Sequence, residues 1–123
     1  MQTFDLKAAL TCGILVLAAL TGVVTTAMGR PLNVPVSTVH KLLSLAAIVL
    51  AVLLAIDLLG ALGLAVPVLA LVLCTGLFFL GVLVTGALLS FETLASVPLR
   101  AVHTALPFLA IAGAALLVYT RVR

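Results

Sequence analysis

The chain has very few charged residues. Lysine, arginine, aspartate and glutamate make up 7% of its 123 residues, whereas soluble domains carry roughly 25%. Residues 8–29, 58–91 and 101–120 contain no such charge at all. This composition argues against a water-soluble fold. Because a membrane-spanning helix needs about 20 apolar residues, the sequence predicts four spans, at about residues 8–29, 38–59, 67–90 and 99–120.

Acidic residues are scarcer still, and their position near the ends of the spans argues against a transport function. The chain has three, Asp5, Asp57 and Glu92, all near the ends of predicted spans. A proton-coupled exporter needs a carboxylate within the membrane, so this function is disfavoured. The formal net charge of +3 is too small and too scattered for a nucleic-acid surface. Ser44 lies one turn from His40, but no third group orients the ring for hydrolysis.

The four spans leave no residues for a soluble domain, so we expect a single transmembrane domain over residues 1–123. Short loops make successive helices antiparallel neighbours, which predicts an all-α, up-and-down four-helix bundle. The sequence also contains an internal repeat, whose copies cover about 8–60 and 67–121. Residues 34–40 match residues 97–103, and the pair Thr21-Gly22 matches Thr85-Gly86. Each copy is a helical hairpin, and the implied pseudo-two-fold axis runs along the membrane normal.

The chain has only two histidines, His40 and His103, and they occupy equivalent positions in the two copies. The axis exchanges the second and fourth helices, so both imidazoles should lie at one depth on a diagonal of the bundle. That diagonal is about 12–14 Å for helices packed 8–10 Å apart, which two imidazoles span only with a metal between them. We therefore predict that His40 and His103 are the axial metal ligands of one haem. The alternative is a duplication that retained both as structural residues; zinc or copper is disfavoured because no Asp, Glu or Cys lies near them.

Six further residues are candidates for binding this haem. Gly22 and Gly86 would leave room for the flat macrocycle, although tight helix packing also explains them. Ser44 would hydrogen-bond locally or touch the ligand ring. Three cations, Arg30, Arg100 and Lys41, lie at the same end of the predicted helices as the histidines. They would bind the haem propionates, with the two arginines as the better candidates and Lys41 third, or they would anchor the helices at the membrane interface. Because the chain has no Cys-x-x-Cys-His motif, the group would be a non-covalent haem b.

The starts of the second and fourth helices resemble a known family. Val39-His40-Lys41-Leu42-Leu43-Ser44-Leu45 and Val102-His103-Thr104-Ala105-Leu106-Pro107 are similar to the corresponding segments of small four-helix membrane cytochromes b and related uncharacterised bacterial four-span proteins. The resemblance implies axial ligation by His40 and His103 and electron transfer. Many of these cytochromes have four histidines and two haems. With only two histidines, this chain cannot hold a transmembrane pair of haems unless protomers share ligands.

The expected function is therefore that of an electron carrier rather than a stand-alone enzyme. Its partners would be the lipid bilayer and a quinone or redox protein, with a homo-oligomer or larger membrane complex as its setting. The alternative is a non-redox structural or assembly subunit. The distribution of positive charge does not decide the orientation of the chain in the membrane, because three cations lie on each side. The side of the termini has Lys7, Arg121 and Arg123, and the side of the histidines has Arg30, Lys41 and Arg100. If the second set binds propionates, the termini are cytoplasmic in a bacterial inner membrane.

Overall fold

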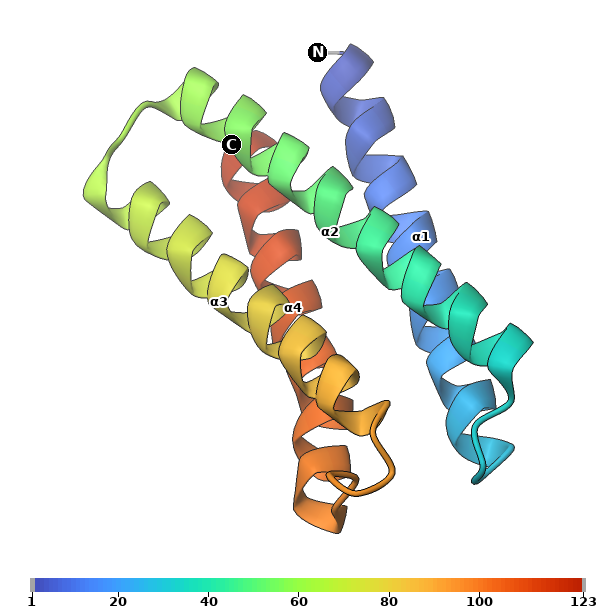
Figure 1. The fold of residues 1–123 in the computed structure, drawn as a ribbon. Coiled ribbons are helices and arrows are strands. Elements are labelled where there is room, and N and C mark those ends of the chain that lie inside the picture. The colour runs from blue at the N-terminus through green and yellow to red at the C-terminus, as the bar shows by residue number, and fades with distance from the viewer. Residues whose placement is uncertain (1, 123) are drawn as a thin grey trace. The chain divides into compact units, whose positions relative to one another are not determined.

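The computed structural model describes residues 2–122 and shows an all-α protein, as predicted. Its four helices are α1 (Gln2–Ala27), α2 (Val34–Leu62), α3 (Val66–Leu89) and α4 (Val97–Val122) (Figure 1). Each of them is long and apolar enough to cross a membrane. Helices α1, α2 and α4 begin two to six residues before the predicted spans, because an apolar run marks the hydrocarbon core and a helix continues beyond it into the interface.

The two helices that carry a histidine begin with equivalent caps. Asn33 precedes α2, and its side-chain oxygen accepts a hydrogen bond from the Val36 N–H (3.2 Å). Ser96 precedes α4, and its hydroxyl accepts one from the Leu99 N–H (3.4 Å). Such caps satisfy N–H groups that have no partner within the helix. They fix the first residue of each helix, so that His40 and His103 are both the seventh residue of theirs.

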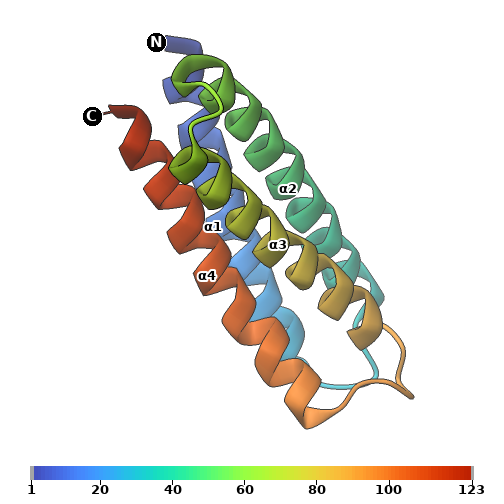
Figure 2. The ribbon, with the colours of Figure 1, turned by 90° about the vertical axis from the view of Figure 1, so that its left-hand side faces the viewer.

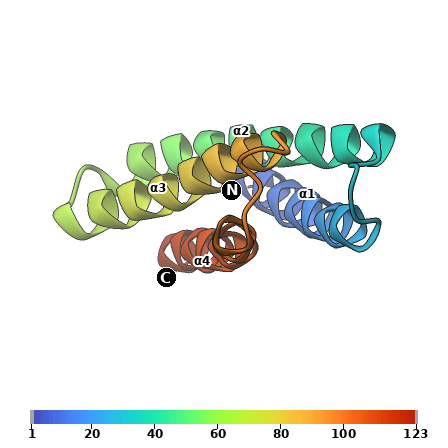
Figure 3. The same cartoon turned by 60° about the horizontal axis from the view of Figure 1, so that its bottom comes forward.

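The chain divides into two compact units, Met1–Leu54 and Ala55–Arg123, with the division inside α2. In the first unit, α1 and α2 run antiparallel from the short loop that joins them (Figures 1 and 2). In the second unit, α3 and α4 form the other antiparallel hairpin. Figure 3 shows the loop of residues 90–96 that joins them. The first unit therefore holds α1 and most of α2, and the second holds α3 and α4 together with the last eight residues of α2.

The face of α2 and α4 that carries the histidine is buried along its length. On α2, Ala47 and Leu54 follow His40 at intervals of seven residues and are 1% and 3% exposed. On α4, Ala110 and Leu117 follow His103 at the same intervals and are 1% and 5% exposed. Residues seven apart lie on one face of a helix. The histidines therefore head a stripe that faces protein, while leucines and valines cover the exposed faces of all four helices, as lipid contact requires.

Candidate cofactor site

His40 reaches from α2 across to α1 and hydrogen-bonds to two of its residues. Its Nδ1 atom lies 2.9 Å from the carbonyl oxygen of Ala18 and 3.3 Å from Oγ1 of Thr21. A carbonyl oxygen can only accept a hydrogen bond, so Nδ1 must carry the proton. In a neutral ring with this tautomer, the lone pair that binds metals is on Nε2.

His103 repeats this arrangement between α4 and α3. Its Nδ1 atom lies 2.8 Å from Oγ1 of Thr85. The Thr85 hydroxyl donates its own proton to the carbonyl of Gly81, at 2.7 Å. Its oxygen is therefore the acceptor for the Nδ1–H of His103. The second hairpin thus selects the same tautomer as the first, through the equivalent threonine.

The two predicted glycines lie directly under the two rings. A β-carbon placed on Gly22 would lie 2.9 Å from Cε1 of His40, and one on Gly86 would lie 3.0 Å from Cε1 of His103. Carbon atoms in contact are normally about 3.5–4.0 Å apart, so a larger residue would displace the imidazole. Each glycine admits the ring of its own hairpin; the further role of leaving room for a macrocycle stays a prediction.

The remaining predicted residues lie around the same helix ends. Ser44 makes the local bond that was one of its two predicted roles, since its hydroxyl donates to the His40 carbonyl at 2.8 Å. Three cationic residues are exposed: Arg30 in the loop before α2, Lys41 beside His40, and Arg100 in the first turn of α4. His40 belongs to the first unit and His103 to the second, so their convergence on one haem stays a prediction.

The threonines that hold the histidines were not among the predicted site residues. Thr21 and Thr85 are equivalent in the repeat, and each precedes a predicted glycine. The sequence therefore did contain a feature that could have identified these threonines, namely a threonine–glycine pair that is repeated together with the histidines. The second acceptor of His40, the Ala18 carbonyl, has no sequence signal because any residue supplies a backbone carbonyl.

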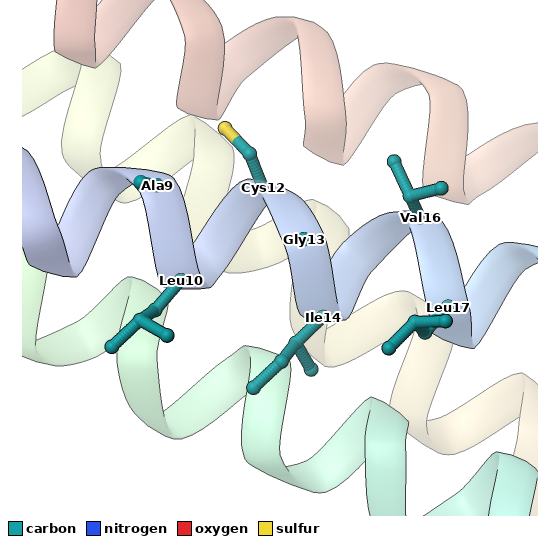
Figure 4. Close-up of a pocket in the computed structure, with 7 residues that line it drawn as sticks. All are labelled: Ala9, Leu10, Cys12, Gly13, Ile14, Val16 and Leu17. Carbon is teal, nitrogen blue, oxygen red and sulfur yellow. The ribbon is translucent and has the colours of Figure 1, made fainter.

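A separate open hollow lies along α1 and is almost wholly apolar. Figure 4 shows Cys12 and Val16 projecting from one side of the helix and Leu10, Ile14 and Leu17 from the other. No charged side chain lines this hollow, and Cys12 is a free, exposed thiol. A lone thiol in an apolar surface packs as a small hydrophobic group, so this hollow does not resemble a cofactor site.

Comparisons of the chain with protein-family models, with curated proteins and with solved structures found no match. The functional argument therefore depends on the residues of the chain and on the geometry within each hairpin.

Proposed function

We propose that this chain is a membrane-bound b-type haem protein that transfers electrons, with one haem between His40 and His103. The observation that supports it is the repeated Nδ1–H contact, made by both histidines with an oxygen acceptor on the preceding helix. Metal-binding histidines almost always donate their second ring N–H to such an acceptor, which orients the ring and strengthens the ligand. Both hairpins thus present an imidazole in the tautomer that iron requires.

The depth of the histidines in the membrane fits this role. His40 lies eight residues before the middle of the 29-residue α2, which is about 12 Å along the helix axis. His103 lies about 10 Å from the middle of the 26-residue α4. The hydrocarbon core extends about 15 Å to either side of its centre. Both rings therefore belong to the edge of that core, where a polar side chain is costly and usually functional.

Different residues of each hairpin would have different roles in binding the haem. His40 and His103 would bind the iron, and Gly22 and Gly86 would let the rings pack closely against α1 and α3. When bound, the haem would supply one-electron oxidation and reduction. With His40 and His103 both holding the group, the chain would carry electrons rather than bind a substrate there.

The cations near the histidines would bind the carboxylates of the group. Arg30, Arg100 and Lys41 are exposed at the ends of the hairpins that the histidines also occupy. A guanidinium binds a carboxylate through two parallel hydrogen bonds, so the two arginines are the better candidates. Lys41 would contribute as a point charge.

One haem near one membrane face cannot carry electrons across the whole bilayer. Its partners would therefore be a lipid-soluble quinone or a redox protein that docks at the same face, within a homo-oligomer or a larger membrane complex. If the cations at the histidine end serve the propionates, the termini lie in the cytoplasm of a bacterial cell and the haem lies toward the outer side of the inner membrane.

The absorption spectrum of the purified chain tests this proposal. We expect protein purified in detergent from haem-sufficient cells to show a low-spin, six-coordinate haem b, at one haem per chain. His40→Ala and His103→Ala should each abolish this signal, because each removes one axial ligand. Thr104→Val is the matched control, since Thr104 is exposed and its hydroxyl donates within α4, to the Arg100 carbonyl. A colourless, folded preparation that does not take up added haemin would falsify the proposal.

The second candidate is a non-redox structural or assembly subunit, and one observation favours it. Each histidine already bridges the two helices of its own hairpin, which is a structural role in itself. In that case, His40→Ala and His103→Ala would lower the stability of the chain, and no haem would bind to the parent protein. The same spectra, combined with unfolding measurements, therefore separate the two functions.

A further inference from the structure

We propose that Thr75 is a two-position conformational switch at the contact between α3 and α4. In one position, which the structure shows, its hydroxyl is turned toward Gly113 of α4 and has no hydrogen-bond partner. In the other position, the hydroxyl turns back and donates to the Leu71 carbonyl, one turn earlier on α3. The inference concerns the second hairpin alone and does not depend on the proposed function.

The hydroxyl of Thr75 is buried without a partner. Three threonines of the described chain are buried, and the other two, Thr11 and Thr85, donate to carbonyls of their own helices. Thr75 is 4% exposed, and its oxygen has no hydrogen-bond partner among the described residues. It is the tenth residue of the 24-residue α3, which places it about 4 Å from the middle of the helix. The hydrocarbon core holds no water that could replace the missing bond, so the unpaired hydroxyl costs free energy.

Packing against Gly113 explains why the hydroxyl does not turn back. A β-carbon on Gly113 would overlap Oγ1 of Thr75 and lie 3.1 Å from its Cβ and Cγ2 atoms. The oxygen therefore fills the space that the glycine leaves, where an α-hydrogen of Gly113 gives it only a weak C–H···O contact. Turning the hydroxyl back would put in its place either a hydrogen, which leaves a gap, or the methyl group, which is larger than the oxygen. Either change weakens the packing of α3 against α4.

Packing and hydrogen bonding therefore favour different positions of the same side chain. While α3 and α4 are in contact, packing holds the hydroxyl against Gly113 and leaves it unpaired. When the two helices separate, this packing is lost, and the hydroxyl is able to donate to the Leu71 carbonyl. Because a hydrogen bond forms on separation, the helices should part more easily here than at a purely apolar contact.

The first hairpin has no such switch at the equivalent position. Thr11 is the repeat equivalent of Thr75, but its hydroxyl already donates to the Lys7 carbonyl at 2.7 Å. The equivalent of Gly113 is Leu50, whose β-carbon occupies the space that a glycine leaves open. The two copies share the threonine but not its surroundings, so the second hairpin is the one in which separation pairs a buried hydroxyl.

NMR of the chain in mild detergent, with threonine labelled by carbon-13 and nitrogen-15, tests the two positions. Couplings from the methyl carbon to the backbone give the side-chain rotamer of each threonine. In the parent, Thr11 should have a rotamer that permits a bond to its own helix, and Thr75 should not. Gly113→Ala fills the space at the contact, so Thr75 should change to a rotamer that permits this bond. Gly76→Ala is the matched control, because a β-carbon at Gly76 meets nothing within 4 Å, and it should leave Thr75 unchanged.

A second measurement uses the parent alone and does not require Gly113→Ala to fold. In a denaturing detergent that separates the helices but leaves them helical, Thr75 should change its rotamer, whereas Thr11 should keep its own because its bond lies within α1. A parent in which Thr75 already bonds to its own helix in mild detergent would overturn the inference. An unchanged Thr75 rotamer after the helices separate, or in folded Gly113→Ala, would also overturn it, as would the same change of rotamer in Gly76→Ala.

Discussion

At the scale of single residues, two glycines decide whether the imidazoles can lie where they do. Gly22 and Gly86 are the two glycines of the described chain whose missing β-carbon would meet a histidine ring. A helical glycine is destabilising by about 1 kcal/mol relative to alanine. The close approach of each ring to the helix backbone explains why glycine is nevertheless present at both positions.

Substitution of Gly22 therefore tests the packing of His40. In Gly22→Ala, the new methyl group would lie 2.9 Å from Cε1 of His40, so the ring must move away from Thr21 and Ala18. We expect a loss of about 1–3 kcal/mol in stability, as for other overpacked sites. Under the proposed function, the displaced ring would also lose most of the haem. Haem per chain and thermal unfolding in detergent measure the two effects.

Gly13→Ala is the matched control on the same helix, because a β-carbon at Gly13 meets no atom within 4 Å. This variant should be slightly more stable than the parent, as alanine is the better helix former. Under the proposed function, it should also keep its haem. Equal haem contents in the two variants would show that the ring does not depend on the small residue beneath it.

The sequence predicted the residues His40, Gly22, His103 and Gly86 but placed all four in one haem site. The structure shows that each histidine contacts the glycine of its own hairpin. The sequence did not show that the ring itself fills the space above the glycine. That contact depends on the rotation of α1 against α2 and on the histidine rotamer. Neither of these produces a periodic pattern of residues that could be recognised in the sequence.

At the scale of elements, the α3–α4 hairpin has a close helix crossing of its own. Gly113 on α4 faces Thr75 on α3, whose side chain is 4% exposed. A β-carbon at Gly113 would overlap Oγ1 of Thr75 and approach its Cγ2 to 3.1 Å. Small residues at such points let two membrane helices approach closely. The position of this crossing was not predicted, because the equivalent residue in the first copy, Leu50, is large.

Gly113→Ala should therefore weaken the second hairpin. We expect a loss of about 1–3 kcal/mol, because the new methyl group must push α3 and α4 apart or force Thr75 out of its rotamer. Unfolding in mixtures of mild and denaturing detergent measures this change. The control is Gly76→Ala, next to Thr75 on α3, where a β-carbon meets nothing within 4 Å. If both variants unfold alike, the crossing is not a close one.

The helix ends were predicted less well than the helices themselves. Apolar runs locate the part of each helix that crosses the hydrocarbon core, and all four helices contain the predicted runs apart from one or two residues at the ends. The starts of α2 and α4 depend instead on the caps Asn33 and Ser96. Because one offset relates both caps and both histidines, the repeat preserves the number of residues from the cap to the histidine.

At the scale of the whole molecule, the repeat constrains how the chain inserts into the membrane. Each copy contains two spans, an even number, so both copies should enter with the same orientation. The loop within each hairpin would then lie on one side of the membrane. The loop between the hairpins would lie on the other side, together with both termini.

Cysteine labelling of intact bacterial cells tests this topology. In a parent with Cys12→Ala and Cys74→Ala, single cysteines replace Met28 after α1, Leu64 between α2 and α3, or Glu92 after α3, all exposed positions. A membrane-impermeant maleimide should label Met28→Cys and Glu92→Cys from outside. It should label Leu64→Cys only after permeabilisation, because the proposed orientation puts that loop and the termini in the cytoplasm. Labelling of Met28→Cys and Leu64→Cys from one side would contradict the four antiparallel spans, whereas a reversed pattern would keep the spans and place the histidine end in the cytoplasm.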